Sequence, residues 1–276
     1  MHAQTQKPST ERTRQVYVSV LDKKGAPVET VAPTDFNVRE DGKPREVIEV
    51  RPADQPMHLA LLVDDSQAAS DATSHLREGL AALLERLQGQ ATIALITFGE
   101  RPTVVADYTK DTEQLKARAA RLFPRQGAGA YLLDAIFDAS RGLARRETDR
   151  PVILAITFEG VEYSNRHYQP VLDELMKSGA TLHVVAVGTP SSSLDDEMRN
   201  RNMVIAEGTV RTGGRRDQVL AVSGIPDKLK QVADEMLHQH VLTYGRPEAL
   251  IPPEKLEVTT TRRDWTVRAR TRLVKR

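Results

Sequence analysis

The stretch His58-Leu-Ala-Leu-Leu-Val-Asp-Asp-Ser-Gln-Ala68 decides the fold. Its first part is an almost unbroken apolar run, which is typical of a strand buried on both faces of a parallel sheet. The polar residues Asp64, Asp65 and Ser66 follow at once, and a segment with helical periodicity comes next, at 74–87. Because the ligand-binding loops of open α/β sheets follow the carboxyl ends of the strands, these polar residues are candidates for a functional site.

Strand and helix candidates alternate beyond this stretch. Further buried-strand candidates are 92–98, 152–157 and 182–187, and periodic segments lie at 112–122, 131–144 and 171–177. A last helix opens with Pro226-Asp227 and runs to about His238. This alternation predicts an α/β fold with a Rossmann-like, doubly wound, mostly parallel sheet.

Both chain ends show a different pattern, in which apolar and polar residues alternate as in β-strands. Asp41-Gly42 lies between two such runs and is a strong hairpin signal, and the alternation returns after Pro252-Pro253. We therefore expect a flexible N-terminus at 1–12, a small discontinuous β module formed by 13–56 and 241–276, and an α/β domain at 57–240.

The composition limits the classes of function. A net charge of +1 and 4% aromatic residues argue against a dedicated nucleic-acid-binding protein, so no nucleic-acid partner is expected. No stretch approaches the roughly 18 apolar residues of a membrane helix. The chain has no cysteine, which excludes disulfides and thiolate metal sites. Ala3-Gln4 is similar to residues left after signal cleavage, so we expect an exported protein, periplasmic or extracellular, whose signal peptide is absent from this sequence.

Two basic features near the C-terminus have simple interpretations. Arg268, Arg270 and Arg272 fall on one face of a predicted strand, which we interpret as a solvated face. His238 and His240 are close in sequence but have no third ligand candidate nearby, so packed or exposed histidines are favoured over a zinc site.

Three segments, taken in order, resemble the von Willebrand factor type A family. The loop Asp64-x-Ser66-x-Ala68 is similar to the family's Asp-x-Ser-x-Ser metal loop. Residues Gly129–Ile136 are similar to its Gly-Thr-Ala-Leu-Tyr-Asp-Ala-Ile segment, and Ile153–Gly160 to the strand and loop that usually end in Ser/Thr-Asp-Gly. The flanking segments resemble those of bacterial exported proteins with this domain.

The resemblance implies a Mg²⁺ or Mn²⁺ site at the strand ends, built from carboxylates and hydroxyls, with one position left for an acidic side chain of a partner. Asp64 and Ser66 match ligand positions, and Glu159 stands near a third, whereas Ala68 and Ala130 carry no donor. We therefore expect a degenerate site of Asp64, Ser66 and Glu159 that binds Mg²⁺ or Mn²⁺ weakly or not at all, and no other cofactor. The alternative role for Ser66 is to cap the following helix.

A non-enzymatic protein–protein interaction or adhesion module is the function we expect from this resemblance. Its partner, an unidentified protein, would dock on the loops at the strand ends, with Asp65, Tyr131, Glu162 and Tyr163 as candidate contacts. The sequence has none of the nucleophile-elbow, phosphate-loop or dinucleotide motifs of common enzymes. Two alternatives stay open: an assembly protein that pairs through edge strands of the β module, and a metal-dependent hydrolase.

Overall fold

The computed structural model describes residues 12–146, 148–190, 195–247 and 251–273. Residues 1–11, nearly all of the predicted flexible N-terminus, therefore lie outside the described residues. Arg12 is the first residue of strand β1.

A mostly parallel sheet of six strands, in the order β10-β9-β8-β5-β6-β7, forms the centre of the α/β domain. Its parallel strands are β5 (Met57–Val63), β6 (Ala91–Thr97), β8 (Pro151–Phe158), β9 (Thr181–Val187) and β10 (Arg216–Val219). The edge strand β7 (Thr103–Thr109) pairs antiparallel with β6. The predicted α/β fold is thus confirmed, although the sequence pattern predicts neither β7 nor β10.

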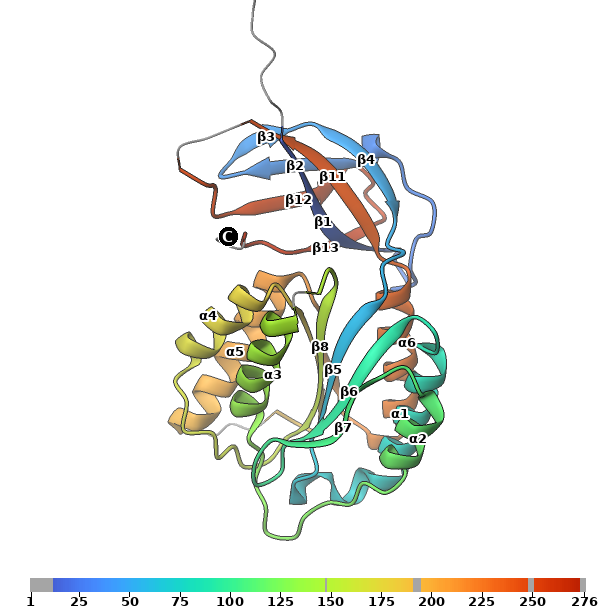
Figure 1. Cartoon of the computed structure of the whole chain (residues 1–276), viewed down its shortest axis with the longest axis vertical. Helices are drawn as coiled ribbons and strands as arrows, with labels where there is room; N and C mark the ends of the chain where they lie inside the picture. Colours follow the sequence, from blue (N-terminus) through green and yellow to red (C-terminus); the bar gives the residue numbers. More distant parts are fainter. Residues whose placement is uncertain (1–11, 147, 191–194, 248–250, 274–276) are drawn as a thin grey trace, which may run out of the picture.

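Helices cover both faces of this sheet (Figure 1). One face packs against α1 (Thr73–Arg86), α2 (Thr112–Ala119) and α6 (Ile225–Leu237). The other packs against α3 (Leu132–Arg146), α4 (Tyr168–Ser178) and α5 (Asp196–Thr212). The central strands are buried on both sides because each sheet face has its own apolar core, as the continuous run 59–63 predicts.

Two further antiparallel sheets, in the orders β13-β1-β11-β4 and β12-β2-β3, are formed by the chain ends. Their strands are β1 (Arg12–Leu21), β2 (Phe36–Glu40), β3 (Lys43–Arg45), β4 (Val47–Pro52), β11 (His240–Arg246), β12 (Leu256–Thr260) and β13 (Thr266–Ala269). Asp41 and Gly42, with φ of 46° and 79°, form the predicted turn between β2 and β3. These sheets confirm a small β module built from both ends, whereas its boundaries stay a prediction.

Buried ion pairs join the β module to the α/β domain. Glu235 on α6 is 1% exposed, and its carboxylate accepts hydrogen bonds from Arg215 at 2.7 Å and from Arg268 of β13 at 2.8 Å. Arg270 donates to the carbonyl oxygen of Gly179 at 2.8 Å. The prediction of a solvated arginine face is therefore wrong for Arg268 and Arg270, because this face packs on the α/β domain.

Candidate functional site

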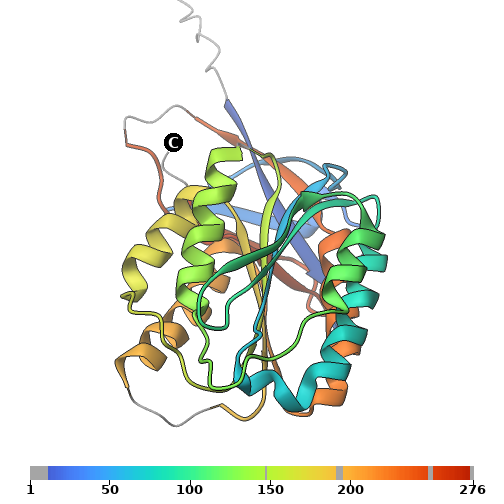
Figure 2. The same cartoon turned by 60° about the horizontal axis from the view of Figure 1, so that its bottom comes forward.

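Loops meet at the carboxyl ends of β5, β6 and β8, at the end of the α/β domain that lies away from the β module (Figure 1, and seen from below in Figure 2). Backbone hydrogen bonds join them: Gln67 N donates to Ala128 O at 3.0 Å, Tyr131 N to Phe98 O at 2.8 Å, and Ala130 N to Val161 O at 2.8 Å. The loops therefore form one connected frame rather than independent segments.

Asp64 lies at the centre of this frame and is completely buried. Its Oδ1 accepts the backbone N–H of Ser66 at 2.9 Å, and its Oδ2 accepts the N–H of Phe158 at 3.0 Å and the hydroxyl of Thr157 at 3.3 Å. Burial raises the pKa of the Asp64 carboxyl, against the lowering by these donors. Oδ2 thus joins the end of β5 to the end of β8, whereas Oδ1 holds the loop that follows β5.

Arg201 reaches the same place from α5, and its side chain is 2% exposed. One terminal nitrogen of its guanidinium donates to Oε2 of Glu159 at 3.3 Å. The other lies 3.4 Å from the hydroxyl oxygen of Thr157 and 3.5 Å from the carbonyl oxygen of Phe158. The Thr157 hydroxyl also contacts Asp64. The positive charge of Arg201 therefore lies among the residues for which the sequence predicts a metal site.

Glu162 is a third acid in this region and is 3% exposed. Its Oε1 accepts the N–H of Leu132, the first residue of α3, at 3.1 Å and the N–H of Ser164 at 3.2 Å. Burial raises the pKa of Glu162 to about 7, although the charge of Arg201 and the bonds from Ser164 act in the opposite direction.

Comparison with known proteins identifies the domain that carries these loops. A family model described as von Willebrand factor type A domain matches residues 59–159. The chain thus has a von Willebrand factor type A (VWA)-like α/β fold. The matched segment runs from Leu59, within β5, to Glu159, so Arg201 and the β module lie outside it.

Solved structures similar to this chain include VWA proteins from bacteria and animals. A von Willebrand factor type A protein from Catenulispora acidiphila covers 98% of this chain and 75% of its own, with 10% identity and a TM-score of 0.56. BatB from Bacteroides thetaiotaomicron covers 65% and 98%, with 15% identity and a TM-score of 0.50. Proximal thread matrix protein 1 of the mussel byssus, with a zinc-occupied MIDAS motif, covers 74% and 50%, with 16% identity and a TM-score of 0.54.

These likenesses establish the VWA fold alone, because the identities are low. The chain spans about half the length of the mussel byssus proteins that it matches. No curated protein matches the chain.

The side chains at the VWA strand ends do not fit a divalent-cation site. Ala68 and Ala130 supply no oxygen donor, and within the described parts of the chain no group of three or more His, Asp or Glu is placed to hold a metal ion. Mg²⁺ requires several oxygen ligands in a near-octahedral arrangement, whereas the guanidinium of Arg201 lies against Glu159 and Thr157. Of the residues expected as ligands, Asp64 contacts Ser66, Thr157 and Phe158, and Glu159 contacts Arg201.

Ser66 does not cap the helix that follows it. It is 2% exposed and precedes the short 3-10 helix of residues Gln67–Ala72, but its side chain makes no capping hydrogen bond. The expectation that its hydroxyl caps the helix is therefore wrong.

Asp65 belongs to the frame of the loops. It is 6% exposed, its Oδ1 accepts the N–H of Gly99 at 2.6 Å, and its Oδ2 pairs with Nε of Arg125 at 2.9 Å. A Cβ at Gly99 would lie only 2.8 Å from the same Oδ1, so this close approach requires glycine. Burial makes Asp65 and Glu162 unavailable as direct partner contacts in this conformation.

Tyr163 and Val161, by contrast, are on the surface, with exposed fractions of 51% and 58%. The Tyr163 ring lies 6.1 Å from the ring of Tyr131, and it covers Gly129 so closely that an added Cβ there would lie 2.4 Å from the ring. The apolar surface of Val161, Tyr163 and Tyr131 is thus held on a rigid support; we call it the loop patch. Sequence reasoning selected the two tyrosines and missed Val161.

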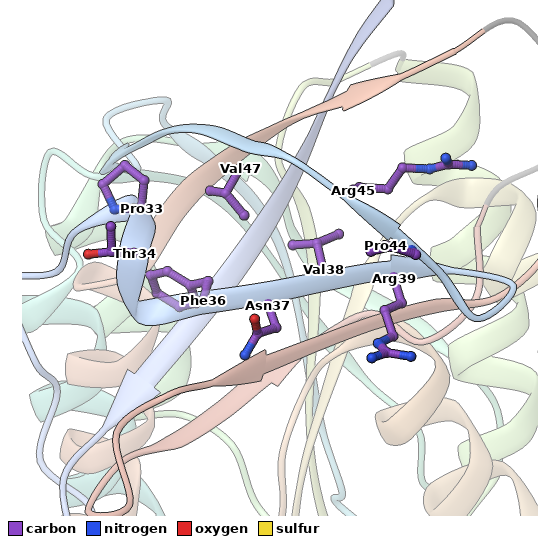
Figure 3. Close-up of a pocket in the computed structure, with 9 residues that line it drawn as sticks. All are labelled: Pro33, Thr34, Phe36, Asn37, Val38, Arg39, Pro44, Arg45 and Val47. Carbon is purple, nitrogen blue, oxygen red and sulfur yellow. The ribbon is translucent and has the colours of Figure 1, made fainter.

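A separate hollow of about 260 Å³ lies in the β module (Figure 3). Phe36, Val38 and Val47 contribute apolar lining, and Arg39 and Arg45 contribute charge. This hollow is formed by the β2–β3 hairpin and the start of β4, so it is no part of the VWA loop site.

Proposed function

We propose that the VWA domain is a non-enzymatic protein-interaction module whose partner docks on the loop patch without a bridging metal ion. The observation that carries this proposal is the exposure of Val161 and Tyr163 beside Tyr131, on loops joined by backbone hydrogen bonds. Aromatic residues with a fixed position are the usual centres of binding energy in protein interfaces.

The arrangement of the chain favours this end of the domain for docking. The β module lies at the opposite end of the sheet from the loops after β5, β6 and β8 (Figure 1), and Val161 and Tyr163 are exposed. Because the loops are already held in place, a partner would order few further groups on binding, which lowers the entropic cost of association.

We also propose that the chain acts outside the cytoplasm. One of the bacterial structural neighbours is an aerotolerance-related membrane protein from Bacteroides fragilis. Among the helices that the structure describes, none is long and apolar enough to cross a bilayer.

Replacing Tyr163 with alanine and Val161 with serine in one variant tests the docking proposal. We expect the double variant to bind the partner at least tenfold more weakly, because loss of a central aromatic contact costs about 2 kcal/mol or more. The partner is first captured on the unmodified chain from cells that make it and identified by cross-linking. The dissociation constant of the purified pair is then measured by calorimetry.

Val210→Ser is the matched control, because Val210 is 61% exposed and lies near the far end of α5. Its dissociation constant should equal that of the unmodified chain. Equal binding by the double variant and the unmodified chain, or an equal loss in Val210→Ser, would refute docking on the loop patch. Thermal melting of all variants separates a binding defect from unfolding.

A further inference from the structure

We propose that the guanidinium of Arg201 is a built-in cation of this VWA domain, which replaces a divalent metal ion and holds the end of β8 against α5 and β5. The inference concerns only contacts within the chain. It therefore does not depend on the partner proposed above.

The first support is the position of the guanidinium. Three of its acceptors, Glu159 Oε2, the Thr157 hydroxyl and the Phe158 carbonyl, belong to consecutive residues at the carboxyl end of β8. A fourth, Oδ1 of the neighbouring Asn202, lies 3.4 Å away on α5. One planar, multi-donor cation thus contacts oxygens of the last two residues of β8 and of the residue that follows, which is an arrangement that arginine provides better than lysine.

The second support is the balance of charge. Asp64, Glu159 and Glu162 are all largely shielded from solvent, with side chains of Asp64 and Glu162 buried and that of Glu159 10% exposed. The positive charge of Arg201 stabilises the ionised forms of Asp64 and Glu162, besides its direct pair with Glu159. A buried acidic cluster requires such compensation, since an isolated buried charge is strongly unfavourable.

The third support is the absence of any route for an outside carboxylate. Arg201 is 2% exposed, so a partner's acidic side chain cannot reach it in this conformation. In the arrangement that the family resemblance implies, a partner's carboxylate completes the metal coordination. A partner's carboxylate cannot contact Arg201 in the same way. Any contact with a partner must use exposed groups such as the loop patch.

Substitutions at Arg201 and Glu159 test the built-in charge through thermal melting. Arg201→Met keeps much of the side-chain length and removes the charge, and we expect its melting temperature to fall by on the order of 10 °C. Glu159→Gln should lower the melting temperature of the unmodified chain, yet raise that of Arg201→Met, because it then removes an uncompensated acid. This reversal of sign measures the coupling between the two charges.

Two further variants keep the test decisive. Arg201→Lys retains the charge and should melt well above Arg201→Met, so the comparison remains possible even if Arg201→Met does not fold. Arg199→Met is the matched control on α5, where the Arg199 side chain is 62% exposed, and it should leave the melting temperature within about 1 °C. Equal melting of the Lys and Met variants, with no rescue by Glu159→Gln, would overturn the charge role and leave only packing.

Metal titration of the unmodified chain provides an independent readout. We expect melting to be the same in EDTA, Mg²⁺ and Mn²⁺, and Mn²⁺ to give no bound signal in electron paramagnetic resonance. Bound Mn²⁺ that disappears in Asp64→Asn would overturn the proposal, because it would show that a divalent ion still uses this place.

Discussion

Replacing Glu235 with alanine is expected to lower the free energy of unfolding by about 3–5 kcal/mol, because it leaves two arginines partly buried without their shared acid. Glu235 is 1% exposed, and its carboxylate joins Arg215 at 2.7 Å to Arg268 at 2.8 Å. Arg215 precedes β10 and Arg268 is in β13, so one acid connects the α/β domain to the β module. Urea unfolding of the purified chain measures the change.

Asp264→Ala is the control for the Glu235 substitution. Asp264 and Lys23 also form an ion pair, but their side chains are 65% and 72% exposed. Loss of this pair should therefore change the free energy of unfolding by at most about 1 kcal/mol. Hydrogen exchange should additionally increase along β13 in Glu235→Ala. If Glu235→Ala lowers the free energy of unfolding no more than Asp264→Ala does, the ion pairs of Glu235 do not stabilise the contact between the α/β domain and the β module.

Replacing Glu162 with glutamine is expected to stabilise the protein at alkaline pH, by up to about 3 kcal/mol. The folded-state pKa of Glu162 is about 7, above the ordinary value of 4.5, because burial disfavours the charged carboxylate. The folded state therefore binds this proton more tightly than the unfolded state. This contribution to stability is fully present below about pH 4.5 and is lost as the pH rises through 7.

Unfolding measured at pH 4.5, 6 and 8, with EDTA present, checks the prediction for Glu162→Gln. The variant and the unmodified chain should agree at the lowest pH and diverge as the pH rises, because glutamine resembles the protonated acid. Glu113→Gln, at a side chain that is 80% exposed, should show no such divergence. A variant that is less stable than the unmodified chain at pH 8 would show instead that the N-terminal amides of α3 require an ionised carboxylate.

The central part of the fold could be predicted from sequence because its signals are local. The apolar run of β5 is buried on both faces, and positive φ angles at Asp41 and Gly42 produce the hairpin that this dipeptide predicts. The edge strand β7 escaped prediction because its burial does not follow a clean alternation. Its partner β6 has a buried apolar centre, Ile93 to Leu95, that sequence patterns reveal more readily.

Helix α5 escaped prediction for a reason that also concerns the site. Its buried face includes Met198, Val204 and Ile205, but Arg201, Gly208, Thr209 and Thr212 interrupt the apolar stripe that marks an amphipathic helix. The flanking signals were present, with Asp195 as N-cap and Gly213 as the residue after the last turn. Without α5, the sequence could supply the acids of the site but not the cation that lies among them.

The alternation of Arg268 and Arg270 correctly predicts that their side chains point the same way. It does not predict that they point at the α/β domain rather than at solvent. Alternation establishes which side chains point the same way, and says nothing of which face another domain covers. The same limit applies to Asp65 and Glu162. The sequence predicts that both lie on loops, but it does not show that the folded loops bury them. Tyr131 and Tyr163 stay predictions as partner contacts.

The pairing of β1 with β11 has a consequence for how the chain is made. Strand β1 pairs with β11 from Arg12 to Val18, so the first β-strand meets its partner only after the whole α/β domain has been synthesised. At roughly 5–20 residues per second, the ribosome needs on the order of 10–40 s between β4 and β11. During that interval the N-terminal strands have unpaired edges. Newly made chains are therefore most exposed to mispairing with one another before the last strands emerge.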